Sequence, residues 1–198
     1  TGSQVACNSQ INARTLNDLE PLLELIAAEG IHTWQLQLTL AHGVAADHPE
    51  ILLQPYQVPE MFVVLERLLD RCAALGIRLY AGNSVGYFGP LEARLRRGST
   101  SRGHYFGCQA GVAALGIESD GKLKGCPSLG GAANNGGQWR EHGLAELWAR
   151  APELAHNRGR GTDTLWGLCA GCYYASVCLG GCTSVSEPLL GRPGNNPM

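Results

Sequence analysis

The sequence predicts an α/β first half followed by a small, loop-rich α+β region that is dense in cysteine. Between positions 16 and 81, a helix pattern, a glycine and a strand pattern follow one another twice, which is typical of parallel strands joined by crossover helices. Farther along, six of the eight cysteines fall between positions 108 and 182. Glycine, at 27 of 198 residues, is about twice as frequent as usual, which indicates many tight turns.

The first helix–strand unit spans residues 16–39. Apolar side chains recur there at helical spacing, at Leu16, Leu19, Leu23, Ile26 and Ala27. Pro21 falls early enough in the helix to be tolerated, and Gly30 ends it. Residues 31–39 then alternate between apolar and polar side chains and are rich in strand formers, so they predict a strand.

The second unit repeats this order after a loop of about twenty residues that contains His42 and His48. Pro59 suits the first turn of a helix, Gly76 ends it, and residues 77–81 predict the next strand. The apolar stripe of this helix consists of Phe62, Leu65, Leu68, Leu69, Cys72 and Leu75. The two units share a boundary sequence, Ala-Ala-Glu-Gly-Ile-His in the first and Ala-Ala-Leu-Gly-Ile-Arg in the second.

Residues 3–7 predict one further strand, so three parallel strands are expected. Three strands are too few for a closed eight-stranded barrel, and they fit part of a barrel or one edge of a doubly wound sheet. Ligands of such sheets bind beyond the carboxyl ends of the strands. This rule selects Asn8, the loop after Thr39, and residues 82–84.

The second half is built from turns and cysteines. Residues 117–124 predict a β-hairpin with Asp120-Gly121 at its turn, which would bring Cys108 and Cys126 together. Residues 144–150 predict a short helix. The remaining late cysteines then follow in quick succession, at Cys169, Cys172, Cys178 and Cys182.

Three chemistries compete for these thiols. Disulfides suit small secreted domains without a sufficient core, and this chain has apolar residues enough for one. Structural zinc sites use Cys-x2-Cys pairs, of which Cys169 and Cys172 are an example. Iron–sulfur clusters are favoured because six cysteines, with no histidine among the last four, supply soft ligands for more than one centre.

Written out, the pattern is Cys108-x12-Gly121-x4-Cys126 and, after a gap, Cys169-x2-Cys172-x5-Cys178-x3-Cys182. These two half-motifs resemble the SPASM domain, the C-terminal extension of many radical S-adenosylmethionine (radical SAM) enzymes. Residues 1 to about 95, through the repeat and the sequence His32-Thr33-Trp34-Gln35-Leu36-Gln37, resemble the later part of that family's partial (β/α)6 barrel. The expected division is therefore 1–98 for the barrel part and 99–198 for the SPASM-like domain.

The resemblance implies up to two auxiliary 4Fe-4S clusters. Carried over by position, the ligands of the first cluster are Cys108, Cys126 and Cys182, and those of the second are Cys169, Cys172 and Cys178. It also implies S-adenosylmethionine and a third 4Fe-4S cluster in a full-length parent, with Gln37 and Thr39 on the S-adenosylmethionine side. Zinc is a possible substitute metal.

The implied function is that of the C-terminal portion of an enzyme that modifies a peptide or protein side chain by hydrogen-atom abstraction. The auxiliary clusters would transfer electrons or bind the substrate, and the implied partners are that substrate and an electron donor such as flavodoxin or ferredoxin.

The chain departs from the family's pattern in three ways. The Cys-x3-Cys-x2-Cys motif of the radical-generating cluster is missing, because Cys7 and Cys72 are isolated, so this chain alone is not expected to cleave S-adenosylmethionine. No cysteine follows Cys182, which leaves the second cluster with three thiolates. No cysteine shortly precedes Cys108; His104 stands there and is an alternative ligand.

Composition and net charge argue against some classes of binding partner. The net charge of −2 without a basic block argues against nucleic-acid binding. The absence of a long apolar run or a signal peptide predicts no membrane association and a cytoplasmic location. The alternative function is a non-enzymatic zinc or iron–sulfur module for electron transfer or interaction. A third interpretation, an α/β enzyme with Cys7 as nucleophile, has no partner histidine nearby in sequence.

Overall fold

Three parallel strands form the sheet of the first half. The computed structural model describes residues 5–82, 84–97, 103–155 and 157–198. Its strands β1 (Ala6–Ile11), β2 (Thr33–Leu38) and β3 (Arg78–Ala81) lie in that order, with Ala6 opposite Thr33 and Thr33 opposite Arg78. The predicted parallel arrangement is confirmed, and among the described residues the sheet is open. The strand expected over residues 3–7 instead continues to Ile11, while residues 3 and 4 lie outside the described residues.

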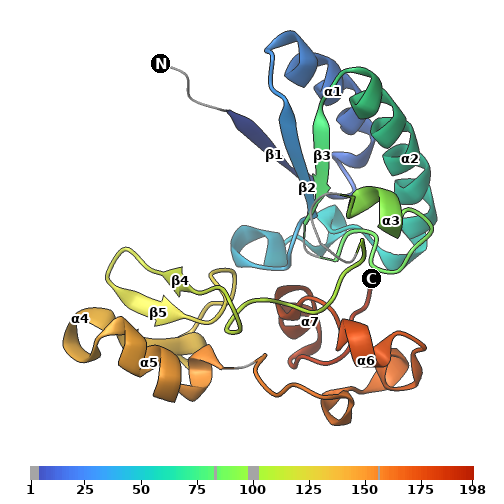
Figure 1. Cartoon of the computed structure of the whole chain (residues 1–198). Helices are drawn as coiled ribbons and strands as arrows, with labels where there is room; N and C mark the ends of the chain where they lie inside the picture. Colours follow the sequence, from blue (N-terminus) through green and yellow to red (C-terminus); the bar gives the residue numbers. More distant parts are fainter. Residues whose placement is uncertain (1–4, 83, 98–102, 156) are drawn as a thin grey trace.

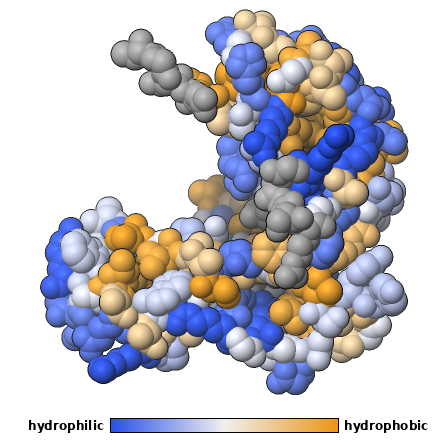
Figure 2. Space-filling model, viewed as in Figure 1, coloured by the Kyte–Doolittle hydropathy of each residue, from blue (hydrophilic) through white to orange (hydrophobic). Residues whose placement is uncertain are grey.

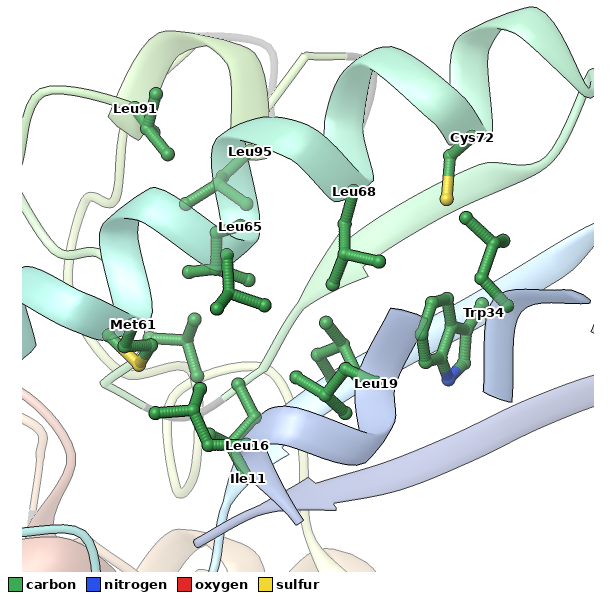
Figure 3. Packing of buried hydrophobic residues seen from close by; sticks show 14 of the residues in the cluster. Ile11, Leu16, Leu19, Trp34, Met61, Leu65, Leu68, Cys72, Leu91 and Leu95 are labelled. Carbon is green, nitrogen blue, oxygen red and sulfur yellow. The ribbon is translucent and has the colours of Figure 1, made fainter. Parts of the chain in front are cut away.

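Two helices, α1 (Leu19–Ala28) and α2 (Val58–Ala74), cover one face of this sheet (Figure 1). The helix–strand repeats predicted from the apolar spacing are confirmed. Leu65 and Leu68 of α2 point toward Leu19 and Trp34, and all four are essentially inaccessible to water (Figure 3). Burying side chains of this size stabilises the fold by about 1.5–3 kcal/mol each, so this layer accounts for most of the stability of the first half.

The shared boundary sequence forms the same helix end twice. Gly30 and Gly76 both have positive φ, at 67° and 68°. The amide of Ile31 donates to the carbonyl of Ile26 at 3.1 Å, and Ile77 donates to Cys72 at 2.8 Å. This is the Schellman arrangement, in which a left-handed glycine turns the chain out of the helix and straight into the next strand.

The face of the sheet opposite α1 and α2 is polar. Asn8, Gln10, Gln35 and Gln37 alternate with the buried side chains of β1 and β2, and the Asn8 amide donates to Oε1 of Gln35 at 3.2 Å. Short 3-10 helices occupy the loop after β2, over Gly43–Ala46, Pro49–Ile51 and Pro55–Gln57. Another 3-10 helix, Leu16–Asp18, precedes α1.

The second half contains a small antiparallel sheet. Strands β4 (Gly116–Ile117) and β5 (Lys122–Lys124) form the predicted hairpin, with Ile117 opposite Leu123. A third strand, β6 (Asn135–Gln138), pairs with β5. It was not predicted, because Asn-Gly-Gly-Gln lacks strand formers. Helix α5 (Leu144–Arg150) occupies the predicted residues, and its Leu147 packs with Leu123 and Leu154 in a separate small core.

Short elements complete the chain. The helices are α3 (Glu92–Leu95), α4 (Trp139–His142), α6 (Ala175–Cys178) and α7 (Thr183–Leu190). The 3-10 helices are Ala132–Asn134, Pro152–Leu154, Thr162–Thr164 and Gly167–Gly171. Among the described residues, no helix has both the length and the apolar character needed to cross a bilayer.

The two halves meet through α3 and the C-terminal tail. The buried carboxylate of Glu92 accepts the amide of Tyr105 at 2.6 Å, and the Tyr87 and Tyr105 rings stack with centroids 3.9 Å apart. Near the C-terminus, the side-chain Nδ2 of Asn196 donates to Ser84 Oγ at 3.0 Å. On the side of β1 the halves leave an open hollow, with hydrophobic surface over the β4–β5 region (Figure 2). The expected boundary between residues 98 and 99 lies outside the described residues.

Candidate metal centre

All six late cysteines lie in loops or at the ends of short elements. Cys126 follows β5, Cys178 ends α6, and Cys182 immediately precedes α7. Cys169 belongs to the 3-10 helix Gly167–Gly171, and Cys172 follows it. Backbone amides in such turns are not used up by a helix or a ladder, so they are free to face a sulfur atom.

The first predicted ligand set gathers in space. Burial raises the pKa of Cys108, and the nearby thiols of Cys182 and Cys126 raise it further. Burial likewise raises the pKa of Cys126, with Cys182 adding to the effect. The three thiols therefore lie near enough to act on one another's titration, although up to 74 positions separate them in the chain (108 to 182).

The second predicted set also gathers. Burial raises the pKa of Cys178 to about 11, and the thiols of Cys169 and Cys172 contribute in the same direction. Cys172 is the exposed member of this set, whereas Cys169 and Cys178 are half-buried. The second set therefore lies at the surface.

Tyr105 lies near thiols of both sets. Burial raises the pKa of its hydroxyl, Cys108 and then Cys182 and Cys178 raise it further, and the hydroxyl of Tyr87 opposes them. The Tyr105 hydroxyl is buried beside the stacked Tyr87 ring. A cavity of about 170 Å³, whose lining includes Cys108, Cys178 and Gly181, lies beside them. The thiols thus border a space rather than filling it.

Backbone amides just downstream point back at the most buried thiols. Hydrogen bonding by the backbone at Ala110 lowers the pKa of Cys108, and that at Ser128 lowers the pKa of Cys126. The backbone at Gly180 acts on Cys178 in the same way. Each of these hydrogen bonds lowers the pKa of its thiol against the effect of burial, because an N–H donor favours the thiolate. This repeated geometry suits sulfur that carries negative charge.

The turn between Cys178 and Cys182 has an unusual backbone. Leu179, Gly180 and Gly181 have φ values of 52°, 75° and 68°, all in the left-handed region. A Cβ atom on Gly180 would lie 3.0 Å from the backbone of Gly194, so only glycine permits this approach of the tail. A leucine in this region costs on the order of 1 kcal/mol, and such strain concentrates at functional sites.

Two polar contacts to sulfur, one for each set, come from the C-terminal part of the chain. In the second set, the backbone amide of Asn196 donates to Sγ of Cys169 at 3.3 Å. In the first set, Ser184 Oγ lies 3.0 Å from Sγ of Cys182. The Phe88 and Tyr174 rings stack with centroids 4.4 Å apart close to this region of the chain. Hydrogen bonds to sulfur and exclusion of water are the two ways in which a protein adjusts a thiolate-bound metal.

The geometry bears on which metal the thiols suit. All eight cysteines are free thiols, so the disulfide interpretation gains no support. Within the described ranges, no group of three or more Cys, His, Asp or Glu side chains is arranged to hold a single metal ion. Four thiolates bound at about 2.3 Å to one zinc ion lie about 3.8 Å apart.

Gln37 and Thr39 lie apart from this centre, on β2 and just after it. Gln37 belongs to the polar, helix-free face of the sheet. The Thr39 hydroxyl accepts from Nδ2 of Asn12 at 3.0 Å. Asn12 therefore occupies the carboxyl end of β1, and the prediction that placed Asn8 there is wrong because the strand runs four residues farther than Cys7. Asn83, within the predicted 82–84 segment, lies outside the described residues.

The remaining candidates have structural surroundings. Cys72 is 1% exposed in the main core, where burial raises its pKa to about 11. Cys7 packs against the same core, with its sulfur 3.8 Å from Ser9 Oγ. His104 Nδ1 lies 2.8 Å from the carbonyl oxygen of Tyr105, and its ring packs against Phe88. His48 bonds Glu50 at 3.1 Å on the surface.

Three residues near the centre were not predicted from the sequence: Tyr105, Asn157 and Asn196. Cys108 raises the pKa of Tyr105, and the Asn157 side chain lowers the pKa of Cys108. Asn196 reaches Cys169 from 27 positions away. Only Tyr105 was recognisable by position, since it lies three residues before a predicted ligand. Comparison of the sequence with protein-family models and with curated proteins found no match.

Proposed function

We propose that this chain is the C-terminal portion of a radical SAM enzyme with a SPASM domain, and that it binds two auxiliary 4Fe-4S clusters. The observation that supports the proposal is that the thiols of Cys182 and Cys126 raise the pKa of Cys108, those of Cys169 and Cys172 raise the pKa of Cys178, and Cys108 and Cys178 line one cavity. Soft thiolates in this number suit iron–sulfur chemistry.

The ligands of the proposed first cluster are Cys108, Cys126 and Cys182, and those of the second are Cys169, Cys172 and Cys178. When bound, such clusters supply one-electron transfer or an open iron that holds a substrate group. With a metal bound to the sulfurs, the backbone amides of Ala110, Ser128 and Gly180 would stabilise the thiolates of Cys108, Cys126 and Cys178, and the amide of Asn196 would do so for Cys169. The stacked Tyr87 and Tyr105 rings would keep water from the first set.

The polar face of the parallel sheet completes the proposal. In a partial barrel, the face without helices lines the interior, where Gln37 and Thr39 would border S-adenosylmethionine. The substrate would be a peptide or protein side chain, and electrons would come from a donor such as flavodoxin or ferredoxin. A cytoplasmic location would keep the free thiols reduced. The missing radical-cluster motif means that a full-length parent would perform the hydrogen-atom abstraction.

Metal analysis of the anaerobically purified and reconstituted chain tests the proposal. Two full clusters correspond to about eight irons and two paramagnetic signals after reduction. Cys126→Ser and Cys178→Ser are each expected to remove about half of the iron and one signal. The matched control, Cys72→Ser, changes a thiol of the hydrophobic core and should leave the iron content unchanged.

Two outcomes would reject the proposal. A chain that takes up no iron under conditions that reconstitute other cluster proteins would not be a cluster protein. A colourless chain holding about one zinc per four thiols, even after anaerobic expression, would support the non-enzymatic zinc module instead.

A further inference from the structure

A second and larger cavity, of about 270 Å³, shares Arg160 with the cysteine cavity. Its lining includes Arg158, Thr164, Thr183 and Glu187, none of which is a proposed metal ligand. Figure 1 places α7, which carries Thr183 and Glu187, in the middle of the molecule where the two halves meet. The cavity is thus near the proposed centre but built from different side chains.

Both arginines of this cavity are held in place by the fold. Arg158 donates through Nε to the carbonyl of Gly111, and its guanidinium lies 4.0 Å above the Trp148 ring. Arg160 donates through Nη1 to Thr183 Oγ1 at 2.9 Å and to Asn157 Oδ1 at 3.1 Å. These contacts immobilise the two guanidinium groups before any ligand arrives, which reduces the entropy lost on binding.

One terminal nitrogen of each arginine makes no hydrogen bond within the described residues. These nitrogens, Nη2 of Arg158 and Nη2 of Arg160, are buried. A buried, charged donor without an acceptor destabilises the fold. Both arginines line the same cavity, so an anion bound there lies beside two positive charges.

The charge of the cavity lining and the shape of the guanidinium groups indicate which kind of acceptor binds there. The two guanidinium groups and the carboxylate of Glu187 sum to +1 on the cavity lining, so a monoanion neutralises it and a dianion does not. A carboxylate is planar and matches the fork of guanidinium N–H groups. The volume admits a small acid or the end of a peptide rather than a nucleotide.

We propose that this cavity binds the carboxylate of a peptide, with Arg158 and Arg160 as its binding residues. The identification of that peptide as the enzyme's substrate rests on the proposed function, whereas binding of a carboxylate does not require the clusters. A carboxylate held beside Arg160 would anchor the peptide next to the cysteine cavity, since this arginine lines both spaces.

Isothermal titration calorimetry of the full chain tests the site with four probes. Acetyl-Gly-Gly presents a C-terminal carboxylate, acetyl-Asp-amide presents a side-chain carboxylate, acetyl-Gly-Gly-amide presents neither, and inorganic phosphate presents a different anion. We expect at least one of the two carboxylate probes to bind, and the one that binds more tightly identifies the source of the carboxylate. We expect no binding of the amide and weaker binding of phosphate.

Variants separate binding from folding. Arg158→Lys and Arg160→Lys keep the charge but lose the fork, and each should weaken carboxylate binding about tenfold or more. Glu187→Gln removes the opposing charge and should tighten binding several-fold, a gain that a misfolded chain does not show. The control is Arg192→Gln, because Arg192 also stacks on a tryptophan, Trp166, at 4.0 Å but does not line the cavity.

Three results would overturn the proposal: no binding of either carboxylate probe, equal binding of the amide, or tighter binding of phosphate. Iron content is measured separately on the same preparations. If the chain binds carboxylate but takes up no iron, the carboxylate site stands and the proposed function is rejected. If it takes up iron but binds no carboxylate, the proposed function stands and the carboxylate site is rejected.

Discussion

Replacement of Glu92 by alanine tests how the two halves of the chain are joined. Glu92 is 7% exposed, and its Oε1 accepts the Tyr105 amide at 2.6 Å and lies 3.5 Å from Nε of Arg96. Arg96 is 5% exposed and donates to the carbonyl oxygens of Ala81 and Val85. Its guanidinium also lies 5.1 Å from the centroid of the Tyr87 ring, which stacks on Tyr105.

The expected loss follows from these contacts. Removing the carboxylate leaves a buried guanidinium without its ionic partner, which costs about 3–5 kcal/mol. The Tyr105 amide also loses a charged acceptor. With a urea dependence of about 2 kcal/mol per molar, the unfolding midpoint should fall by roughly 1.5–2.5 M. The assay is urea unfolding of the full chain, monitored by tryptophan fluorescence.

Two further variants make this reasoning refutable. Glu92→Gln keeps a carbonyl oxygen for the Tyr105 amide and removes only the charge, so its loss should be smaller than that of Glu92→Ala. Glu66→Ala, on the exposed side of α2, should change stability by no more than about 0.5 kcal/mol. A loss below about 1 kcal/mol for Glu92→Ala would show that the buried Glu92 carboxylate stabilises neither Arg96 nor the contact with Tyr105.

Three other substitutions test the packing, the turn and the surface charges. Leu68→Ala removes a side chain that is fully buried in the main core and should lower the free energy of unfolding by about 2–5 kcal/mol. Leu25→Ala, at a site 57% exposed, should have little effect. Equal losses at both sites would contradict the assigned core. Gly181→Ala puts a Cβ atom into a left-handed position 2.8 Å from Nδ2 of Asn196 and should cost about 1–3 kcal/mol in urea unfolding. Gly130→Ala, where a Cβ atom meets nothing within 4 Å, is its control, and a neutral Gly181→Ala would mean that the tail is not held as described. A hydrogen bond from Arg67 is the largest cause that lowers the pKa of Glu20 from 4.5, so the pair between α1 and α2 is fully stabilising above about pH 4.5 and is lost as the pH falls through the lowered value. Glu20→Gln should therefore lower the melting temperature at pH 7 but not at pH 3, and the same difference at both pH values would refute this origin.

The first half of the fold could be predicted because its signals are local. Apolar spacing marked both helices, and the repeated Gly-Ile boundary encodes a helix end whose hydrogen bonds involve residues within five positions of each other. The error at β1 has a physical reason. Residues 8–11 are largely polar because one face of that strand is free of helices, so hydropathy does not extend the strand to Ile11.

The hairpin at Asp120-Gly121 and the helix at 144–150 were also within reach of local rules. Strand β6 was not, since Asn135–Gln138 becomes a strand through pairing with β5 rather than through its own propensity. The grouping of the late cysteines came from the resemblance to the SPASM domain and stays a prediction. The amides that face their sulfurs could not be read from the sequence, because they depend on turn conformations.

The amino-acid sequence by itself determined the parallel helix–strand repeats and the hairpin, because periodicity and turn residues act over short stretches of chain. Only the tertiary structure decided that Tyr105 lies near the late thiols, that the tail reaches Cys169, and that Arg158 and Arg160 line one cavity. Those contacts join residues distant in the chain, and they form only when the burial of the core and the fit of α3 and α7 bring the segments together.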